Sequence, residues 1–471
     1  RDVFKFGDQF GFDWGNRTAT ARWNHIFNDR LFSNLTLIYS DFDYSIQFSV
    51  DDNSGAKITS GIRDLQAKYD LTYFISPELK AFFGASYIDH RFKPGSLTPT
   101  GEASFFNAFD LAPQDATEAA GYVELEQTLS PRLSLRYGLR TSWFGIFGPG
   151  TTYTYDPEEF NDPLIQTPTP IDSVSHAPGE LIQSYLGFEP RAALRYTLTP
   201  TSSLKASYDR TYQYLHLASN ATASLPTDLY IPSSQYVRPQ IADQWSLGYF
   251  RNFEANTYET SVEVYYKRMF GQLDLKDGAD ILLNSRLETQ LRQGYGWSYG
   301  AEFFVQKNKG DLTGWVSYTL SWTEREIVGI NQGRTFYAKN DRRHNVSVVG
   351  TYEFSPRVTL SGTWVYLTGN AVTFPEGKYV FNGNPVAVYS ERNGYRLPDY
   401  HRMDVSLTLQ GRRNDERKFK REWNFSIYNL YWRKNAFFID FRQSEDDPSI
   451  TEVKKVYLFG LIPSITYNLS F

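Results

Sequence analysis

Apolar and polar residues alternate along many stretches of this chain, which is the pattern of strands with two unlike faces. From residue 132 to 143, leucines and aromatic residues occupy one set of alternate positions, while Arg132, Arg136 and Arg140 occupy the other. Residues 464–471 repeat the pattern, with Ile465, Tyr467, Leu469 and Phe471 between serine, threonine and asparagine. Successive side chains of a strand point to opposite faces. Three arginines on one face are incompatible with a dry core, so we expect that face to meet water.

The segments between these strands alternate between two lengths. Short polar turns are expected near residues 28–30, 76–77, 130–131, 199–200, 253–255, 308–310, 355–356 and 411–417. Long connections are expected near 51–56, 93–117, 145–181, 217–238, 277–291, 327–339, 373–397 and 443–452. Regular alternation of short and long connections is typical of transmembrane antiparallel barrels, and the pattern gives roughly 17 strands. The sequence therefore predicts an all-β transmembrane barrel.

Composition is consistent with this fold. Aromatic residues make up 17% of the 471 residues, yet mean hydropathy is only −0.47. No run of about 18 apolar residues occurs, which excludes helical membrane spans. The chain has no cysteine, so disulfides and thiolate metal sites are excluded. Its net charge of −5 argues against a nucleic-acid partner.

Several motifs, in this order, resemble those of one family. They are Trp14-Gly15-Asn16, Ala21-Arg22-Trp23-Asn24-His25-Ile26-Phe27, Leu37-Ile38-Tyr39-Ser40, Glu263-Val264-Tyr265-Tyr266-Lys267, Ser298-Tyr299-Gly300-Ala301-Glu302, the stretch Trp315–Trp322, Asp341-Arg342-Arg343-His344, the stretch Leu397–Asp404, and Asn429-Leu430-Tyr431-Trp432-Arg433-Lys434-Asn435. The chain resembles the C-terminal barrel part of a TonB-dependent outer-membrane receptor of the Bacteroidetes type.

This resemblance implies a 22-strand barrel preceded by a TonB-binding segment and a plug, neither of which this sequence contains. The strand count then places residues 1–16 in an extracellular loop remnant and residues 17–471 in the transmembrane barrel, with the first strands absent. We therefore expect the strand at 17–28 and the strand at 464–471 not to close on each other. The implied location is the bacterial outer membrane. The implied partners are its lipids, the TonB complex through the absent segment, and a surface lipoprotein.

The implied function is TonB-driven uptake of a specific large nutrient, such as a siderophore, oligosaccharide or peptide, without bond chemistry or a cofactor. Candidate substrate contacts are the aromatic residues of the expected outer loops: Tyr153, Tyr155, Phe160, Tyr230, Tyr236, Phe374 and Tyr379. The side chains expected to face the lumen or plug are Arg132, Arg136, Arg140, Glu259, Glu263 and Lys267. The three arginines are expected to lack partners when no plug is present, unless water fills the lumen. The terminal strand is expected to carry an assembly signal at Tyr467, Leu469 and Phe471.

Sites for metals and anions are only weakly indicated. The six histidines have no metal-ligand spacing. Acidic clusters at 51–52 and 445–447 could bind Ca²⁺, although hydrated loop faces are the more common outcome. The stretch Asp341–His344 could bind an anion or pack against neighbouring loops, and packing is favoured.

Three other functions fit parts of the pattern. A passive porin would need an open lumen and an even strand number. A structural barrel subunit of a larger outer-membrane complex would be retained for assembly rather than transport. A soluble all-β binding protein would be extracted without detergent.

Overall fold

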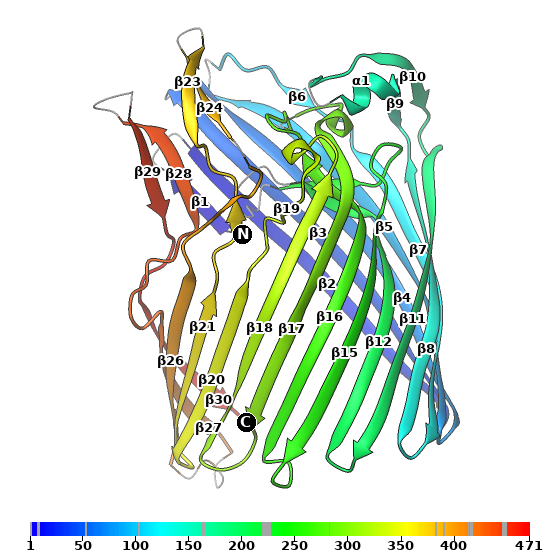
Figure 1. Cartoon of the computed structure of the whole chain (residues 1–471), viewed down its shortest axis with the longest axis vertical. Coiled ribbons are helices and arrows are strands. Elements are labelled where there is room, and N and C mark those ends of the chain that lie inside the picture. The colour runs from blue at the N-terminus through cyan, green and yellow to red at the C-terminus, as the bar shows by residue number, and fades with distance from the viewer. Residues whose placement is uncertain are drawn as a thin grey trace.

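The computed structural model describes the chain except for residues 1, 7–9, 52–53, 102–103, 163–164, 219–227, 282, 382–383, 390, 413, 415–417 and 445–449. In the described part, one antiparallel sheet of 20 strands curls into a barrel wall (Figure 1). Three of these strands are short segments, β1 (Asp2–Phe6), β6 (Phe109–Asp110) and β19 (Phe336–Tyr337). The other 17 are the long strands that the sequence pattern predicts.

The long strands pair in chain order around the wall. They are β2 (Phe10–Asn28), β3 (Leu31–Asp51), β4 (Ser54–Ser76), β5 (Leu79–Thr100), β7 (Gln114–Ser130), β8 (Leu133–Phe147), β11 (Leu181–Thr199), β12 (Ser202–Gln213), β15 (Gln240–Phe253), β16 (Tyr258–Leu275), β17 (Leu291–Lys307), β18 (Leu312–Ile327), β20 (His344–Ser355), β21 (Val358–Leu367), β26 (Tyr400–Gln410), β27 (Lys420–Tyr428) and β30 (Ile462–Ser470).

The remaining elements are small and gather at one end of the barrel, the upper end in Figure 1. They form the hairpins β9 (Gly150–Tyr155) with β10 (Pro170–His176), β13 (Leu215–Ala218) with β14 (Leu229–Pro232), β22 (Ala371–Val372) with β25 (Tyr395–Arg396), β23 (Gly377–Phe381) with β24 (Asn384–Val388), and β28 (Phe438–Gln443) with β29 (Thr451–Val456). Helix α1 (Pro157–Asn161) lies between β9 and β10, whereas the 3-10 turns η1 (Leu287–Gln290) and η2 (Asn331–Gly333) lie in the β16–β17 and β18–β19 connections. None of the helices in the described ranges is long and apolar enough to cross a bilayer.

The opposite end of the barrel consists of tight turns whose geometry is fixed by local side chains. The Asn28 side chain accepts hydrogen bonds from the amides of Arg30 (2.9 Å) and Leu31 (3.0 Å). The Ser130 hydroxyl accepts one from the amide of Leu133 (3.1 Å). Such side-chain caps mimic a backbone turn and end one strand while starting the next. Arg132 lies in the second of these turns and not in a strand, because β8 begins at Leu133.

The two faces of the wall separate by residue parity. Ile62, Phe92, Ala116 and Phe144, from four strands, are buried in one apolar cluster with Tyr214, so these positions face the concave interior. The alternate positions carry exposed apolar side chains, among them Tyr137, Leu139, Leu247, Val264, Tyr467 and Leu469. A continuous outer face of exposed apolar side chains is typical of a barrel in a membrane.

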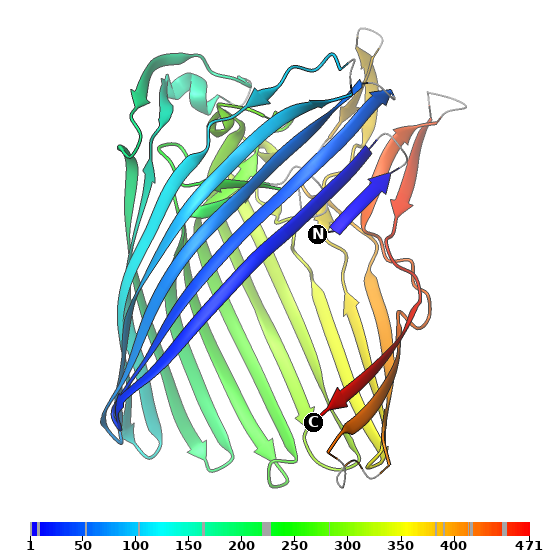
Figure 2. The same ribbon diagram turned by 180° about the vertical axis from the view of Figure 1, so that it is seen from behind.

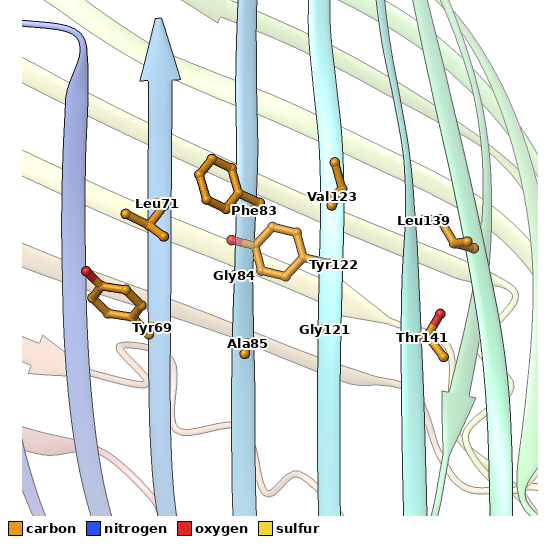
Figure 3. A pocket seen from close by; sticks show the side chains of 10 residues that line it. All are labelled: Tyr69, Leu71, Phe83, Gly84, Ala85, Gly121, Tyr122, Val123, Leu139 and Thr141. Carbon is orange, nitrogen blue, oxygen red and sulfur yellow. The ribbon is translucent and has the colours of Figure 1, made fainter.

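A shallow hollow lies on the outer face between β4, β5, β7 and β8. Figure 3 views this wall with the opposite wall behind it. The hollow measures about 570 Å³ and is lined mostly by apolar atoms of Tyr69, Leu71, Phe83, Ala85, Gly121, Val123 and Leu139. It exists because Ala85 and Gly121, which pair directly across β5 and β7, leave room between larger neighbours.

The wall is not continuous in the described part of the chain. β30 pairs with β27, and β1 pairs with β2, but no pairing joins β30 to β1 or β2. Figure 2 shows the space between these strands. Residues 10–16 are part of β2, and their backbone pairs with β3.

Candidate functional site

The β13–β14 hairpin leaves the wall and crosses the interior of the barrel. β14 contacts β4 and β5, whereas β13 contacts β16 on another part of the wall. Its two strands hydrogen-bond to each other from Leu215 paired with Pro232 to Ala218 paired with Leu229. The hairpin therefore joins wall segments that are not neighbours in the sheet, and it narrows the mouth of the barrel.

Apolar packing holds the hairpin in place. Leu229 and Ile231 of β14 share a buried cluster with Tyr44 of β3, Leu275 of β16 and Leu291 of β17. Fully burying a side chain of this size contributes about 1.5–3 kcal/mol relative to exposure. A docked position inside the barrel is therefore strongly favoured over a free hairpin in water.

Where the hairpin leaves β12, Tyr214 is fixed to the wall. Its ring stacks on Phe144 with centroids 5.0 Å apart and planes 3° from parallel. Its hydroxyl lies 2.8 Å from that of Ser142, which in turn donates to Glu189 at 2.7 Å. The hairpin is thus positioned by an aromatic contact and a hydrogen-bond chain at its root.

His216 of β13 is 1% exposed and bonded only to neutral groups. Its Nε2 lies 2.9 Å from the Ser233 hydroxyl, and its Nδ1 lies 3.1 Å from the Gln240 amide nitrogen. The Gln240 oxygen accepts a bond from Gln272 of β16 at 2.7 Å. Burial lowers the pKa of His216 from 6.5 to about 4, because the imidazolium form would be poorly solvated there. The docked hairpin therefore contains a neutral histidine near neutral pH.

Three of the seven candidate aromatic residues come together above the hairpin. Ring centroids of Tyr155 and Phe160 are 5.5 Å apart, those of Tyr155 and Tyr236 5.4 Å, and those of Phe160 and Tyr236 4.6 Å. Tyr153 lies beside Tyr155 at 6.5 Å. These residues come from the β8–β11 and β14–β15 connections, so their main effect is to pack two loops together.

Polar contacts tie this aromatic cluster to the β16–β17 loop. The Tyr155 hydroxyl donates to Glu288 at 2.8 Å, and Arg292 donates to the carbonyl of Phe160 at 2.6 Å. Burial raises the pKa of Tyr155, and the neighbouring Glu288 carboxylate raises it further. Burial also raises the pKa of Glu288. The cluster therefore holds three loops together, namely the β8–β11, β14–β15 and β16–β17 connections.

The other candidate aromatics lie apart from this cluster. Tyr230 packs edge-on against Phe42 of β3 at 5.8 Å and keeps 36% of its surface exposed. Phe374 stacks on Tyr395 at 5.8 Å. Tyr379 of β23 is 54% exposed. Tyr230 and Tyr379 are therefore the members of the set with ring surface available to a ligand.

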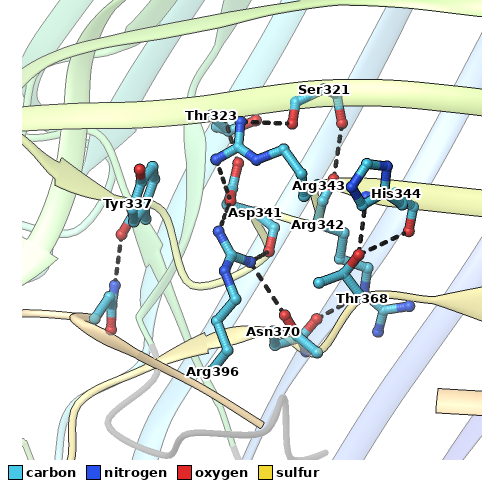
Figure 4. A network of polar contacts seen from close by, with 12 residues as sticks. Ser321, Thr323, Tyr337, Asp341, Arg342, Arg343, His344, Thr368, Asn370 and Arg396 are labelled. Atoms are coloured by element: carbon cyan, nitrogen blue, oxygen red, sulfur yellow. Dashed lines mark hydrogen bonds and ion pairs between the residues drawn. The ribbon is translucent and has the colours of Figure 1, made fainter. Parts of the chain in front are cut away.

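A network centred on Asp341 fixes the loops above β18 to β21 (Figure 4). The Asp341 side chain is fully buried, pairs with Arg396, lies 3.6 Å from Arg343, and accepts a bond from the amide of Thr323 at 2.6 Å. Arg342 donates to Asn370 at 2.6 Å. The stretch Asp341–His344 thus packs neighbouring loops together, as the sequence favoured over an anion site.

Sequence reasoning missed a second charged cluster near the mouth. Arg392 reaches Asp274 at 2.5 Å and Asp277 at 3.1 Å, and Arg325 lies 3.9 Å from Asp274. Arg392 is more than a hundred residues from both aspartates, and Arg325 is about fifty from Asp274, so no local sequence pattern indicates these pairs. Asp277 remains largely exposed, which leaves a carboxylate at the mouth.

The expectation that the interior arginines lack partners is wrong for two of them. Arg136 pairs with Glu124 on β7, and Arg140 reaches Glu118 at 3.1 Å and Glu189 at 2.5 Å. The strand register places these carboxylates beside the guanidinium groups. The wall therefore neutralises these charges by itself.

The remaining candidates for the lumen lie on β16. Glu263 is opposite Glu302, Glu259 accepts a bond from Asn308 at 2.8 Å, and Lys267 is opposite Ser298. Among the described residues, no group of three histidine, aspartate or glutamate side chains is arranged to hold a metal ion. The acidic cluster at 445–447 lies outside the described residues, as does Asp52.

Comparisons with known proteins give one family. A family model described as TonB dependent receptor-like, beta-barrel matches residues 1–430. No curated protein matches the chain.

Solved structures match the fold at low sequence identity. The ferric preacinetobactin receptor BauA from Acinetobacter baumannii has a TM-score of 0.59 at 14% identity, and the match covers 97% of this chain and 63% of that one. The ferric-catecholate import receptor Fiu from K12 E. coli gives 0.58 at 14%, covering 98% and 65%. The copper transporter OprC gives 0.62 at 11%, covering 98% and 66%. The chain thus spans a little under two thirds of the length of the structures it matches.

Proposed function

This chain belongs to the TonB-dependent receptor β-barrel family of the bacterial outer membrane, and from that premise we propose that it forms the barrel of an energised transporter. The transported nutrient is specific and large, and the energy is delivered through TonB. The family consists of receptors and transporters rather than enzymes.

One observation carries this proposal: the barrel interior is crossed by its own β13–β14 hairpin. A hairpin that packs against β4, β5 and β16 obstructs free diffusion. It would have to move, or be bypassed, for a large solute to pass. This favours gated uptake over the open lumen of a passive porin.

We propose a chemical class of nutrient rather than a single compound. The solved structures with this fold include receptors for ferric siderophores and a copper transporter. We propose that Tyr230 and Tyr379 contact the nutrient, because they keep exposed ring surface. In this proposal Tyr153, Tyr155, Phe160, Tyr236 and Phe374 act indirectly, by fixing the loops that carry the contacts.

We also propose that the chain is the C-terminal part of a receptor of the Bacteroidetes type with a 22-strand barrel. The edge of β2 beyond its pairing with β1, together with the free edge of β30, supports further strands between them, since each unpaired backbone group in hydrocarbon costs several kcal/mol. A plug and a TonB-binding segment would belong to the same receptor. Glu259, Glu263 and Lys267 would then face the plug.

Two surfaces are proposed to serve assembly. The β23–β24 and β28–β29 hairpins expose Tyr379, Val388 and Val453, which suits a contact with a surface lipoprotein. At the other end, the outer row formed by Tyr467, Leu469 and Phe471 is exposed and would act as the assembly signal.

Growth under nutrient limitation tests the proposed transport. Cells with and without the receptor gene would receive ferric siderophores, oligosaccharides or peptides as the sole source of iron or carbon, with TonB intact or deleted. We expect a growth advantage on one nutrient that requires both the receptor and TonB. An advantage that persists without TonB would instead support a passive channel.

Fixing the hairpin to the wall should block uptake of that nutrient. Phe42→Cys and Tyr230→Cys place thiols on β3 and β14 in a chain that has no other cysteine. A short bis-maleimide should join them and prevent the hairpin from moving. Radiolabelled nutrient uptake is measured in the same double-cysteine cells before and after linking, because Tyr230→Cys also removes a proposed nutrient contact.

The matched control joins Ser207→Cys to Ser246→Cys, whose hydroxyls lie 2.6 Å apart within the wall. That link leaves the hairpin free, so uptake should continue. Undiminished uptake with the linked hairpin would show that the hairpin is not a gate.

Loop topology gives a further expected result. Ser173 lies in β10 among the long connections, whereas Ser130 lies in a short turn at the other end. On intact cells, a membrane-impermeant maleimide should label Ser173→Cys and spare Ser130→Cys. Both should react after the outer membrane is permeabilised, and the opposite pattern on intact cells would invert the proposed orientation.

Substitutions on the two faces of β8 should differ in cost. Leu135 occupies an outer position, and Ser134 the adjacent inner one. Leu135→Arg places a charge on the lipid-facing side of β8, two residues from its start at the short turn, and should reduce folding stability in lipid vesicles by up to about 1 kcal/mol, the cost near an interface. Ser134→Arg should cost far less. Equal costs in urea-induced unfolding would contradict the assignment of faces.

A further inference from the structure

The outer face carries a row of charged side chains at one level on five consecutive strands. Each member pairs in register with the next across the sheet, and the row consists of Arg17, Asp41, Arg63, Arg91 and Asp115. Lys93 lies just above the row, with its amino group 3.7 Å from Asp41. Towards the short turns, the same face becomes apolar within a few residues, with Leu37, Leu65 and Tyr87 exposed. The row therefore marks the upper boundary of the apolar belt.

Within this row, Arg63 and Arg91 stand directly opposite each other on β4 and β5. Like charges at directly opposed positions of a sheet repel and destabilise the pair. Arg91 has only a long contact, 3.9 Å, with Asp115. In the part of the chain that the structure describes, Arg63 forms neither a hydrogen bond nor an ion pair. In this described part, no anionic side chain is hydrogen-bonded to either guanidinium group, so the repulsion between them is only partly relieved.

Each arginine of the pair has a carboxylate opposite it on its other side, Asp41 for Arg63 and Asp115 for Arg91, but neither carboxylate forms a hydrogen bond with it. Asp41 is shared by long contacts with Arg17 at 3.9 Å and Lys93 at 3.7 Å. Asp43, Asp89 and Asp115 share this face, so the region as a whole is close to charge balance. What distinguishes the Arg63–Arg91 position is local: two guanidinium groups side by side, which suit a phosphate because each offers paired N–H donors.

The hollow on the outer wall lies directly along the strands from this pair. Ala85 is six residues from Arg91 on β5, and Tyr69 is six residues from Arg63 on β4. Six residues of strand span roughly 20 Å. At a strand tilt of about 45° this corresponds to roughly 14 Å of depth, close to one leaflet of a hydrocarbon core about 30 Å thick. A hydrocarbon chain attached to a headgroup at the arginines would therefore reach the hollow.

We propose that this face holds one phosphorylated membrane lipid. Its phosphate lies between Arg63 and Arg91, and an acyl chain runs down β4 and β5 into the hollow beside Ala85 and Gly121 (Figure 3). The lipid supplies an anion that is hydrogen-bonded to the arginine pair and fills the space that the small residues leave. It acts as a fixed part of the outer wall and is independent of the nutrient.

Lipid retention by the native full-length receptor tests the proposal. The receptor is extracted in mild detergent and its bound lipid is measured by native mass spectrometry. Wild type should retain a phosphorylated lipid. Arg63→Gln with Arg91→Gln should weaken retention by about fivefold for each guanidinium removed. Arg268→Gln is the matched control, because Arg268 is an outer-face arginine opposite Asp243 and Trp297 and not opposite another cation.

A second variant tests the acyl subsite. A Cβ atom added at Gly121 would have only the carbonyl oxygen of Gly84 within 4 Å, at 3.9 Å, so the backbone accepts a side chain there, and that of Gly121→Leu would extend into the hollow. Gly121→Leu should reduce retention while leaving both arginines in place. Equal retention in wild type, the double glutamine variant and Gly121→Leu would overturn the proposal.

Added ligands separate a lipid from a free anion. Thermal unfolding of delipidated receptor is measured with phosphatidylethanolamine, with diacylglycerol and with inorganic phosphate. Only the phospholipid should raise the unfolding temperature of wild type, and the rise should be smaller in the double glutamine variant. An equal rise with inorganic phosphate would reduce the site to an anion subsite and refute the lipid assignment. An equal rise with diacylglycerol would refute the role of the phosphate.

Discussion

Asp341→Ala is expected to destabilise the loops above β18 to β21 by about 3 kcal/mol, the lower end of the range for breaking a buried ion pair. The substitution leaves Arg396 and Arg343 without their carboxylate and the amide of Thr323 without its acceptor. The lower end applies because the two guanidinium groups are partly exposed and can recover some hydration. Thermal unfolding and limited proteolysis of the loops measure the loss.

Two control variants separate this effect from a general loss of charge. Asp341→Asn retains an acceptor for Thr323 and should be milder. Glu391→Ala removes an exposed pair with Arg334, 3.8 Å apart, and should change stability by less than about 1 kcal/mol. If Asp341→Ala were no more harmful than Glu391→Ala, the network would not be what fixes these loops.

Acid should release the β13–β14 hairpin through His216. When the hairpin is docked, burial holds the pKa of His216 at about 4, whereas the exposed imidazole titrates near 6.5. Between these values the undocked state binds a proton that the docked state does not, so docking weakens as pH falls. The loss is about 1.4 kcal/mol for each pH unit between 6.5 and 4, and docking is fully favoured above pH 6.5.

Hydrogen exchange of residues 215–218 and 229–232 at pH 7.5 and pH 5 measures this release, after correction for the intrinsic pH dependence of exchange. Protection should fall at pH 5 in wild type. His216→Gln keeps a polar side chain beside Ser233 and Gln240 but cannot titrate, so its protection should not respond to pH in this way. A His216→Gln variant with the same response as wild type would assign the effect to another group.

The strand pattern was predictable because it follows from local alternation. Residues 133–147 and 462–470 form strands that place Tyr137, Leu139, Tyr467 and Leu469 on the exposed outer face, as their period of two requires. The tight turns followed from proline, serine and asparagine, which act within three residues. The number of strands and the alternation of short and long connections could be predicted from the sequence for the same reason.

The barrel mouth was not predictable because its contacts are distant in sequence. Tyr155 meets Glu288, and Arg392 meets Asp274, across more than a hundred residues. The aromatic residues of the long connections were identifiable, but not which would pack together and which would stay exposed. The β13–β14 hairpin was hidden because its two four-residue strands lie within one long connection and are stabilised by the walls they touch.

The self-neutralised charges of the inner wall bear on how another body could move through the barrel. Arg136 already forms an ion pair with Glu124, and Arg140 forms ion pairs with Glu118 and Glu189, all on neighbouring strands. A domain sliding past them would not have to break an ion pair with the wall or leave a bare charge behind it. A domain that moves along this side of the barrel should therefore meet little electrostatic resistance. Most of the resistance to its movement should come from the contacts at the mouth.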